Sequence, residues 1–178
     1  MTQTDLAVKM VLDRWYGSIL NLNRQLDVLT DEQLQLEIAP GKNRGVYLLG
    51  HLIAAHDDML ILLDMGDKLF PELHAPFIAE ADNPATPIPS AAALRSMWTQ
   101  QNEVLQQRFA ALTTEDWFAR HTAISAEDFL KEPHRNKLNI ILTRTSHLQY
   151  HTGQLVLLKN RSAFSMPYAT GICNLFDT

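Results

Sequence analysis

The chain of 178 residues has one cysteine, no long apolar run and no excess of basic residues. The single thiol, Cys173, excludes an internal disulfide framework and a four-cysteine zinc site, and it is compatible with a reducing compartment. Without a run of about 18 apolar residues, we expect no membrane-spanning helix. The formal net charge of −5 argues against a nucleic-acid partner. The first residues mix acidic and basic side chains, so no signal peptide is predicted, and a cytoplasmic protein is expected.

Several catalytic motifs are also missing. The sequence contains no HExxH and no Glu-x-x-His, which disfavours the usual metalloprotease helix and a ferritin-like di-iron centre. It has no GxSxG, no P-loop and no GxGxxG, which disfavours a serine hydrolase, a nucleoside triphosphatase and a dinucleotide-binding enzyme. Cys173 has no evident histidine partner, so a role as nucleophile is disfavoured.

The sequence does carry helical periodicity. Apolar residues recur every three to four positions over 4–29, 44–65, 91–111 and 136–160, which predicts four long helices. An all-α four-helix bundle over residues 1–161, with residues 162–178 as a tail packed on it, is the simplest arrangement. Between the second and third helices, five prolines in residues 66–89 forbid a continuous helix and predict a long connection. This long crossover either shapes a site or only connects the two helices.

Two of the seven histidines, His147 and His151, are four residues apart in the last predicted helix. That spacing places both imidazoles on one face, one turn apart, where they can bind one metal ion. Ile140, Gln154 and Leu158 share this face, so we expect it to point inward. Buried neutral imidazoles need partners, and a cation is an efficient one. The pair alone is a weak signal, because structural HxxxH pairs are common.

His51 strengthens the metal hypothesis. It lies in the most apolar helix, in LLGHLIAAH, where a polar ring must be hydrogen-bonded or bound to a ligand. If the second and fourth helices are neighbours, His51 can face His147 and His151. Three histidines would then hold one ion and leave a position for water or substrate, as in catalytic sites. The alternative is a core histidine hydrogen-bonded to a carbonyl or hydroxyl group.

The other histidines are weaker candidates. His56 follows His51 by five residues, which is about 140° around the helix, so we expect it to face a helix end or solvent. Asp57 and Asp58 are expected at a solvated helix end, with hydrogen bonding to a metal ligand as the alternative. We expect the remaining histidines on the surface: His74, His121 and His134.

Two segments of the chain, GHLIAAHDD and HLQYHTGQL, resemble the second and fourth helices of the DinB/YfiT-like superfamily. NLNRQLDVLTDEQL is similar to the first helix and following turn of that family, and the resemblance covers residues 5–160. Its most specific part is one histidine on the second helix and, on the fourth, His-x-x-x-His followed one residue later by Gly-Gln.

This resemblance implies a four-helix bundle that often forms a homodimer. It also implies a divalent metal ion, such as nickel, zinc or iron, with His51, His147 and His151 as the ligands. Relatives include thiol-dependent transferases and the mycothiol-dependent maleylpyruvate isomerase. The implied function is therefore a metal-dependent enzyme acting on a small-molecule substrate. It would be a thiol S-transferase that uses a low-molecular-weight thiol, or a hydrolase.

The sequence departs from the family at one position. Many relatives carry arginine before the Gly-Gln pair, where this chain has Thr152, so a basic group for an anionic substrate is missing there. Gly153 is expected to allow close approach of another helix, and Gln154 either hydrogen-bonds near the site or serves helix packing. The alternative hypothesis for the whole protein is a non-enzymatic metal-binding or interaction bundle that forms a homodimer.

Overall fold

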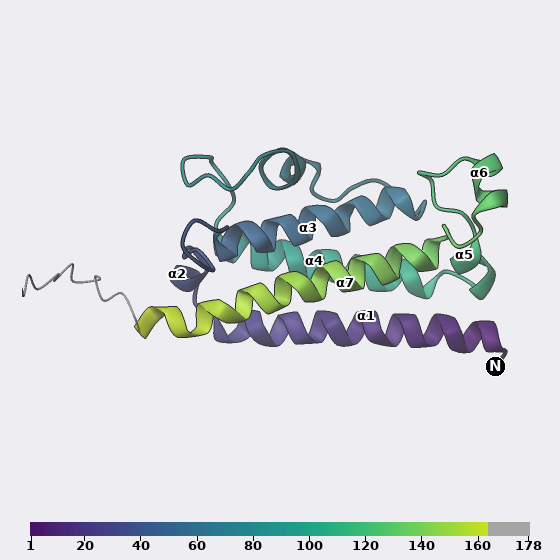
Figure 1. Ribbon diagram of the computed structural model, residues 1–178, viewed down its shortest axis with the longest axis horizontal. Helices are drawn as coiled ribbons and strands as arrows, with labels where there is room; N and C mark the ends of the chain where they lie inside the picture. The colour runs from purple at the N-terminus through teal and green to yellow at the C-terminus, as the bar shows by residue number, and fades with distance from the viewer. Residues whose placement is uncertain (164–178) are drawn as a thin grey trace, which may run out of the picture.

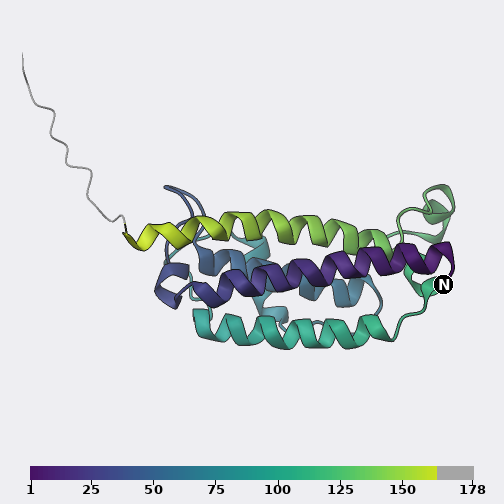
Figure 2. The ribbon, with the colours of Figure 1, turned by 90° about the horizontal axis from the view of Figure 1, so that it is seen from below.

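The computed structural model describes residues 1–163, which form helices and their connections (Figure 1). Within this part, the long helices lie side by side in both views (Figures 1 and 2). They are α1 (Gln3–Val28), α3 (Gly45–Leu62), α4 (Ala91–Ala110) and α7 (Lys137–Leu155). The predicted all-α class is confirmed. The predicted packing of the tail concerns residues that lie, from 164 onward, outside the described part.

Shorter elements occupy the two ends of the long helices (Figure 1). The helix α2 (Asp31–Leu34) lies at one end, and α5 (Thr114–Phe118) and α6 (Ala126–Lys131) lie at the other. The last described element, η3 (Val156–Ala163), is a 3-10 helix that continues α7. The predicted helix over 136–160 therefore tightens into a 3-10 conformation after Leu155.

Capping side chains set most of the helix starts. Thr2, Ser90 and Asn136 each accept a hydrogen bond from an amide in the first turn that follows. At the other end, α3 stops at Leu62, short of the predicted residue 65. Asp64 adopts a left-handed backbone conformation with φ of 57°, which a continuing helix does not allow.

The core lies between the long helices, with α1 packed on α7, α7 on α3, and α3 on α4. Its largest fully buried side chains include Trp15, Leu22, Leu52 and Phe109, and each stabilises the fold by roughly 1.5–3 kcal/mol. In length and composition alone α3 could cross a membrane, but 78% of it is buried inside the protein. That is the environment of a core helix.

The crossover from α3 to α4 runs along the outer side of α3 (Figure 1). It contains a 3-10 turn, η1 (Pro71–Leu73), and a short π-helix, η2 (Ala75–Ala79). The prolines thus break this connection into short turns, as predicted. The ring of Phe77 on η2 is fully buried against α3.

Two carboxylates anchor the crossover to α3. Asp57 accepts hydrogen bonds from the amides of Leu69, at 2.9 Å, and Phe70, at 2.8 Å. Asp82 forms an ion pair with Arg44 at 2.6 Å and also accepts from the Arg44 amide, at the start of α3. Asp57 is 1% exposed, so the prediction that it lies at a solvated helix end is wrong. The carboxylate is buried because it supplies acceptors for two loop amides.

Candidate metal centre

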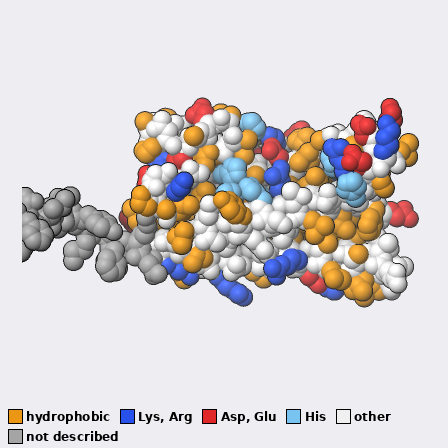
Figure 3. Space-filling model, in the orientation of Figure 1, with side chains coloured by type: hydrophobic (Ala, Val, Ile, Leu, Met, Phe, Trp, Pro, Cys, Tyr) orange, Lys and Arg blue, Asp and Glu red, His pale blue; other side chains and the backbone are white. Residues whose placement is uncertain are grey.

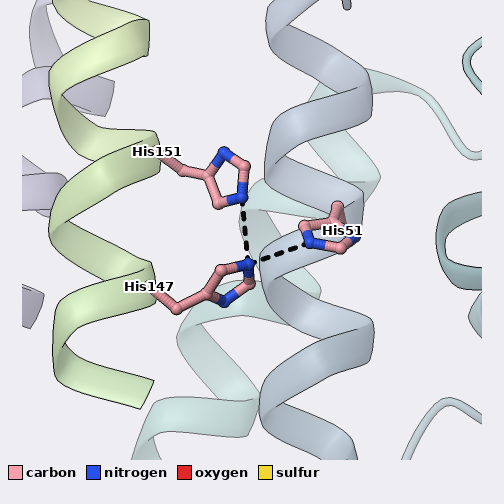
Figure 4. Close-up of side chains that lie close together, drawn as sticks. All are labelled: His51, His147 and His151. Carbon is pink, nitrogen blue, oxygen red and sulfur yellow. Dashed lines mark hydrogen bonds between the residues drawn. The ribbon is translucent and has the colours of Figure 1, made fainter. Parts of the chain in front are cut away.

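His51 of α3 and the pair His147 and His151 of α7 point toward one another across two neighbouring helices (Figure 4). The Nε2 atom of His147 lies 3.0 Å from Nε2 of His51 and 3.0 Å from Nε2 of His151. All three ligand nitrogens lie within 4.8 Å of one another. Nitrogens bound to one ion at about 2.0–2.1 Å are themselves on the order of 3 Å apart. The spacing therefore matches a three-histidine metal site.

The outer nitrogens of two rings are fixed by hydrogen bonds. Nδ1 of His51 lies 2.8 Å from the carbonyl oxygen of Phe77, and Nδ1 of His151 lies 2.7 Å from Oε1 of Gln154. Because both partners are acceptors, each Nδ1–H donates and each neutral ring keeps its lone pair on Nε2. This is the tautomer that a metal-binding histidine needs, and such outer partners orient the ring.

The cluster cannot satisfy its own hydrogen bonds. A neutral His147 carries one ring proton. On Nε2, that proton can be donated to only one of the two facing nitrogens, at His51 or His151. On Nδ1, it meets no acceptor, because this buried atom has no hydrogen-bond partner in the described part of the chain. A divalent cation would satisfy all three converging lone pairs, so the donor set suits a metal ion.

Burial keeps the imidazoles of α7 neutral. The pKa of His147 is lowered to about 4, first by desolvation and then by the nearby His151, His51 and Arg144. The pKa of His151 is also lowered, mainly by desolvation, although its bond to Gln154 opposes this. At neutral pH both rings therefore offer lone pairs, without first losing a proton.

The cluster lies close to the surface. His51 and His147 are half-buried, and His151 is 9% exposed. In Figure 3 histidine side chains form a pale-blue surface near the middle of one face of the molecule. The ring of Tyr47 stacks on that of His51, with 6.3 Å between the ring centroids. The Tyr47 hydroxyl donates a hydrogen bond to the carbonyl oxygen of Glu80 at 2.7 Å. The cluster is therefore partly exposed to solvent through His51 and His147.

The crossover shapes the site as well as connecting two helices. Phe77 supplies the carbonyl that orients His51, and its ring lies against Gly50. A Cβ atom at Gly50 would lie 2.3 Å from that ring, so only glycine allows this contact. The sequence prediction missed Phe77. A glycine within a core helix was the available signal, because it costs about 1 kcal/mol and indicates close packing.

His56 lies in a different environment from the one predicted. It is fully buried, with ring centroids 4.9 Å from Trp15 and 5.3 Å from Trp98. Neither ring nitrogen has a hydrogen-bond partner among the described residues, and burial lowers its pKa well below the usual value. The prediction of a helix end or solvent is wrong, because the turn of α3 that carries His56 is covered by α1 and α4.

The other histidines lie apart from the cluster. His74 and His134 are exposed, as predicted. His121 is 7% exposed, so its predicted surface position is wrong. Its Nδ1 accepts a hydrogen bond from the amide of Ala123, which folds the turn over the ring.

Two of the three residues that follow His151 do not contribute to the cluster. The hydroxyl of the buried Thr152 donates to the carbonyl of Leu148 in its own helix. Gly153 is exposed, and nothing lies within 4 Å of the position of a Cβ atom, so the prediction of close helix approach is wrong. Gln154 does hydrogen-bond in the site, as the acceptor for His151.

Comparisons with known proteins give the family and a similar fold. A sequence model of the DinB superfamily matches residues 18–155. The fold is similar to the crystal structure of a conserved protein from Enterococcus faecalis, with a TM-score of 0.60 and 13% sequence identity over 90% of this chain and 96% of that chain. At this identity the likeness concerns the fold alone. No curated protein sequence matches the chain.

Proposed function

Because this chain belongs to the DinB superfamily, we propose that it is a metal-dependent enzyme that acts on a small molecule. His51, His147 and His151 would bind one divalent ion, of nickel, zinc or iron. The observation that carries the proposal is that Nε2 of His147 lies 3.0 Å from Nε2 of His51 and 3.0 Å from Nε2 of His151. Three protein ligands leave a coordination position open, which distinguishes catalytic from structural sites.

A divalent ion held by imidazoles acts as a Lewis acid and lowers the pKa of a water or thiol ligand. The protein's part is to position the rings. The Phe77 carbonyl fixes His51, and Gln154 fixes His151. Of the two reaction classes, thiol S-transfer and hydrolysis, we favour thiol transfer because of the resemblance to thiol-dependent transferases. Hydrolysis would use the same three histidines.

The partners and location belong to the same proposal. A low-molecular-weight thiol would be the co-substrate of the transferase, and a second copy of the chain would form a homodimer. We place the protein in the cytoplasm, where its single cysteine would stay reduced. The net charge of −5 supports a function without nucleic acid, and the burial of α3 supports one without membrane insertion.

The proposal is tested by elemental analysis of the purified, untagged protein beside His147→Ala. His134→Ala is the matched control, because that histidine is exposed. We expect about one equivalent of a transition metal in the wild type and in His134→Ala, and its loss in His147→Ala. The metal found would then be used in screens for thiol transfer and hydrolysis.

A wild-type protein that takes up no nickel, zinc or iron on reconstitution would contradict the proposal. It would favour the non-enzymatic interaction bundle. Metal that is retained equally in His147→Ala would contradict the ligand assignment. A metal-loaded protein that is inactive in both screens would limit the function to metal binding.

A further inference from the structure

A partly buried arginine, Arg144, lies on the same side of α7 as the histidine cluster. It precedes His147 by three residues and His151 by seven, so all three share one face of the helix. The rise between Arg144 and His147 is about 4.5 Å. On α3, Asp58 follows His51 by seven residues and occupies the equivalent place on that helix.

The two helices run in opposite directions (Figure 1), so Arg144 and Asp58 lie toward the same end of the cluster. The charge of Asp58 attracts that of Arg144. The charge of Arg144 in turn contributes to the lowered pKa of His147. By helix register and by its effect on His147, Arg144 is therefore a charged neighbour of the histidine cluster.

Arg144 differs from the other half-buried arginines of the described part. Each of the other three forms an ion pair with a carboxylate at 2.6–3.0 Å: Arg44 with Asp82, Arg95 with Asp31 and Arg135 with Glu132.

The guanidinium of Arg144 has no ion pair and no hydrogen bond within residues 1–163. Asp58, the acidic group that attracts it, is already paired with Lys68 at 2.5 Å. A partly desolvated guanidinium without a hydrogen-bond acceptor is costly. An anion bound there would offset the cost, because guanidinium and carboxylate groups match in geometry.

From this placement we propose that Arg144 is the specificity-determining residue of the site and binds a carboxylate of the substrate, about one helical turn before His147 on α7. The inference rests on the proposed function and narrows it to anionic small molecules. Thr152, which lacks a charge and bonds to its own helix, does not supply this contact. The positive charge comes from one turn before the histidine pair instead of directly after it.

The test is binding of simple carboxylates, measured by calorimetry on the metal-loaded and the metal-free protein. Acetate, benzoate and succinate are the probes, and acetamide, benzamide and succinamide are their uncharged counterparts. The variants are Arg144→Gln and Arg144→Lys, with Arg108→Gln as a control that removes the same charge from an exposed site on α4. Metal content and thermal unfolding are measured for every variant.

We expect at least one carboxylate to bind the wild type and Arg108→Gln alike, and its amide not to bind. Arg144→Gln should weaken that binding about tenfold or more, and Arg144→Lys should weaken it less. Metal content should stay the same in all variants. Because Arg144 has no hydrogen bond or ion pair within the part of the chain that the structure describes, its loss should leave the unfolding temperature unchanged or higher.

Equal carboxylate binding by Arg144→Gln and the wild type would overturn the inference while leaving the metal proposal intact. So would a wild type that binds none of the three carboxylates, with or without metal. The opposite combination is also informative. If the protein takes up no metal but binds a carboxylate through Arg144, the anion site is supported and the proposed metal-dependent function is contradicted.

Discussion

Two histidines on helix α3 lie five residues apart in opposite surroundings. His51 faces α7, where two further imidazoles bring their Nε2 atoms toward it. His56 faces α1 and α4, where Trp15 and Trp98 enclose it. The first ring has a partner for each nitrogen, and the second has none in the described part.

The difference arises from the neighbouring helices, since both histidines share one apolar helix. A step of five residues turns the helix by about 140°, so the two rings meet different partners. On one side the partners are nitrogen donors and a carbonyl; on the other they are aromatic rings. An imidazole in a core helix therefore indicates a ligand only where a second helix supplies more donors.

The largest expected effect is on metal affinity, and it separates the two histidines directly. His51→Gln removes one of three nitrogen ligands. Its loss of affinity should exceed the roughly 10–100-fold that follows removal of a partner outside the ligand set. His56→Gln, the same substitution on the other side of the helix, should leave affinity nearly unchanged. Competition with a coloured chelator measures both, and similar losses would show that the two environments are not independent.

A second prediction concerns Asp57, the residue that joins the two regions by anchoring the crossover. Asp57→Ala leaves the amides of Leu69 and Phe70 without their acceptor. Each unpaired donor costs about 1–3 kcal/mol, so we expect a loss of about 3 kcal/mol in the free energy of unfolding. Urea unfolding of the metal-free protein measures it.

The control for Asp57 is Asp13→Ala, because Asp13 is 61% exposed in its ion pair with Lys9. That change should stay within about 0.5 kcal/mol of the wild type. If the two variants are equally stable, the crossover is not held by Asp57.

A third prediction tests the contact that positions His51. Gly50→Ala places a methyl group against the Phe77 ring, which must shift together with the carbonyl that orients His51. Overpacking of this kind costs about 1–3 kcal/mol, and metal affinity should fall as well. Gly153→Ala, in the open position on α7, should instead stabilise the protein by about 0.5–1 kcal/mol. A Gly50→Ala variant with normal stability and affinity would contradict the role of Phe77.

These comparisons also show what the sequence could and could not predict. Periodicity and capping residues such as Ser90 locate the long helices, because both act over a few neighbouring positions. The pair His147 and His151 shares a face by helix geometry alone. The surroundings of His56 and the Phe77 carbonyl depend on how separate helices and the crossover pack. Contacts between such distant segments leave no local pattern.

The smallest expected effect at neutral pH is that of His56→Leu. The substitution removes two buried nitrogens without partners and keeps a similar volume, but it loses the ring contacts with Trp15 and Trp98. These changes oppose each other, so we expect the free energy of unfolding to stay within about 1 kcal/mol of the wild type.

The difference in stability between His56→Leu and the wild type should then grow in acid. Burial holds the pKa of His56 well below 6.5, so below that pH the unfolded chain binds a proton that the folded chain does not. Stability therefore falls with decreasing pH in the wild type, and His56→Leu removes that contribution. Thermal unfolding of the metal-free proteins between neutral and acidic pH measures the effect, with His134→Leu as the exposed counterpart. Parallel pH profiles for His56→Leu and the wild type would mean that His56 takes up a proton within the fold, and the contrast with His51 would be lost.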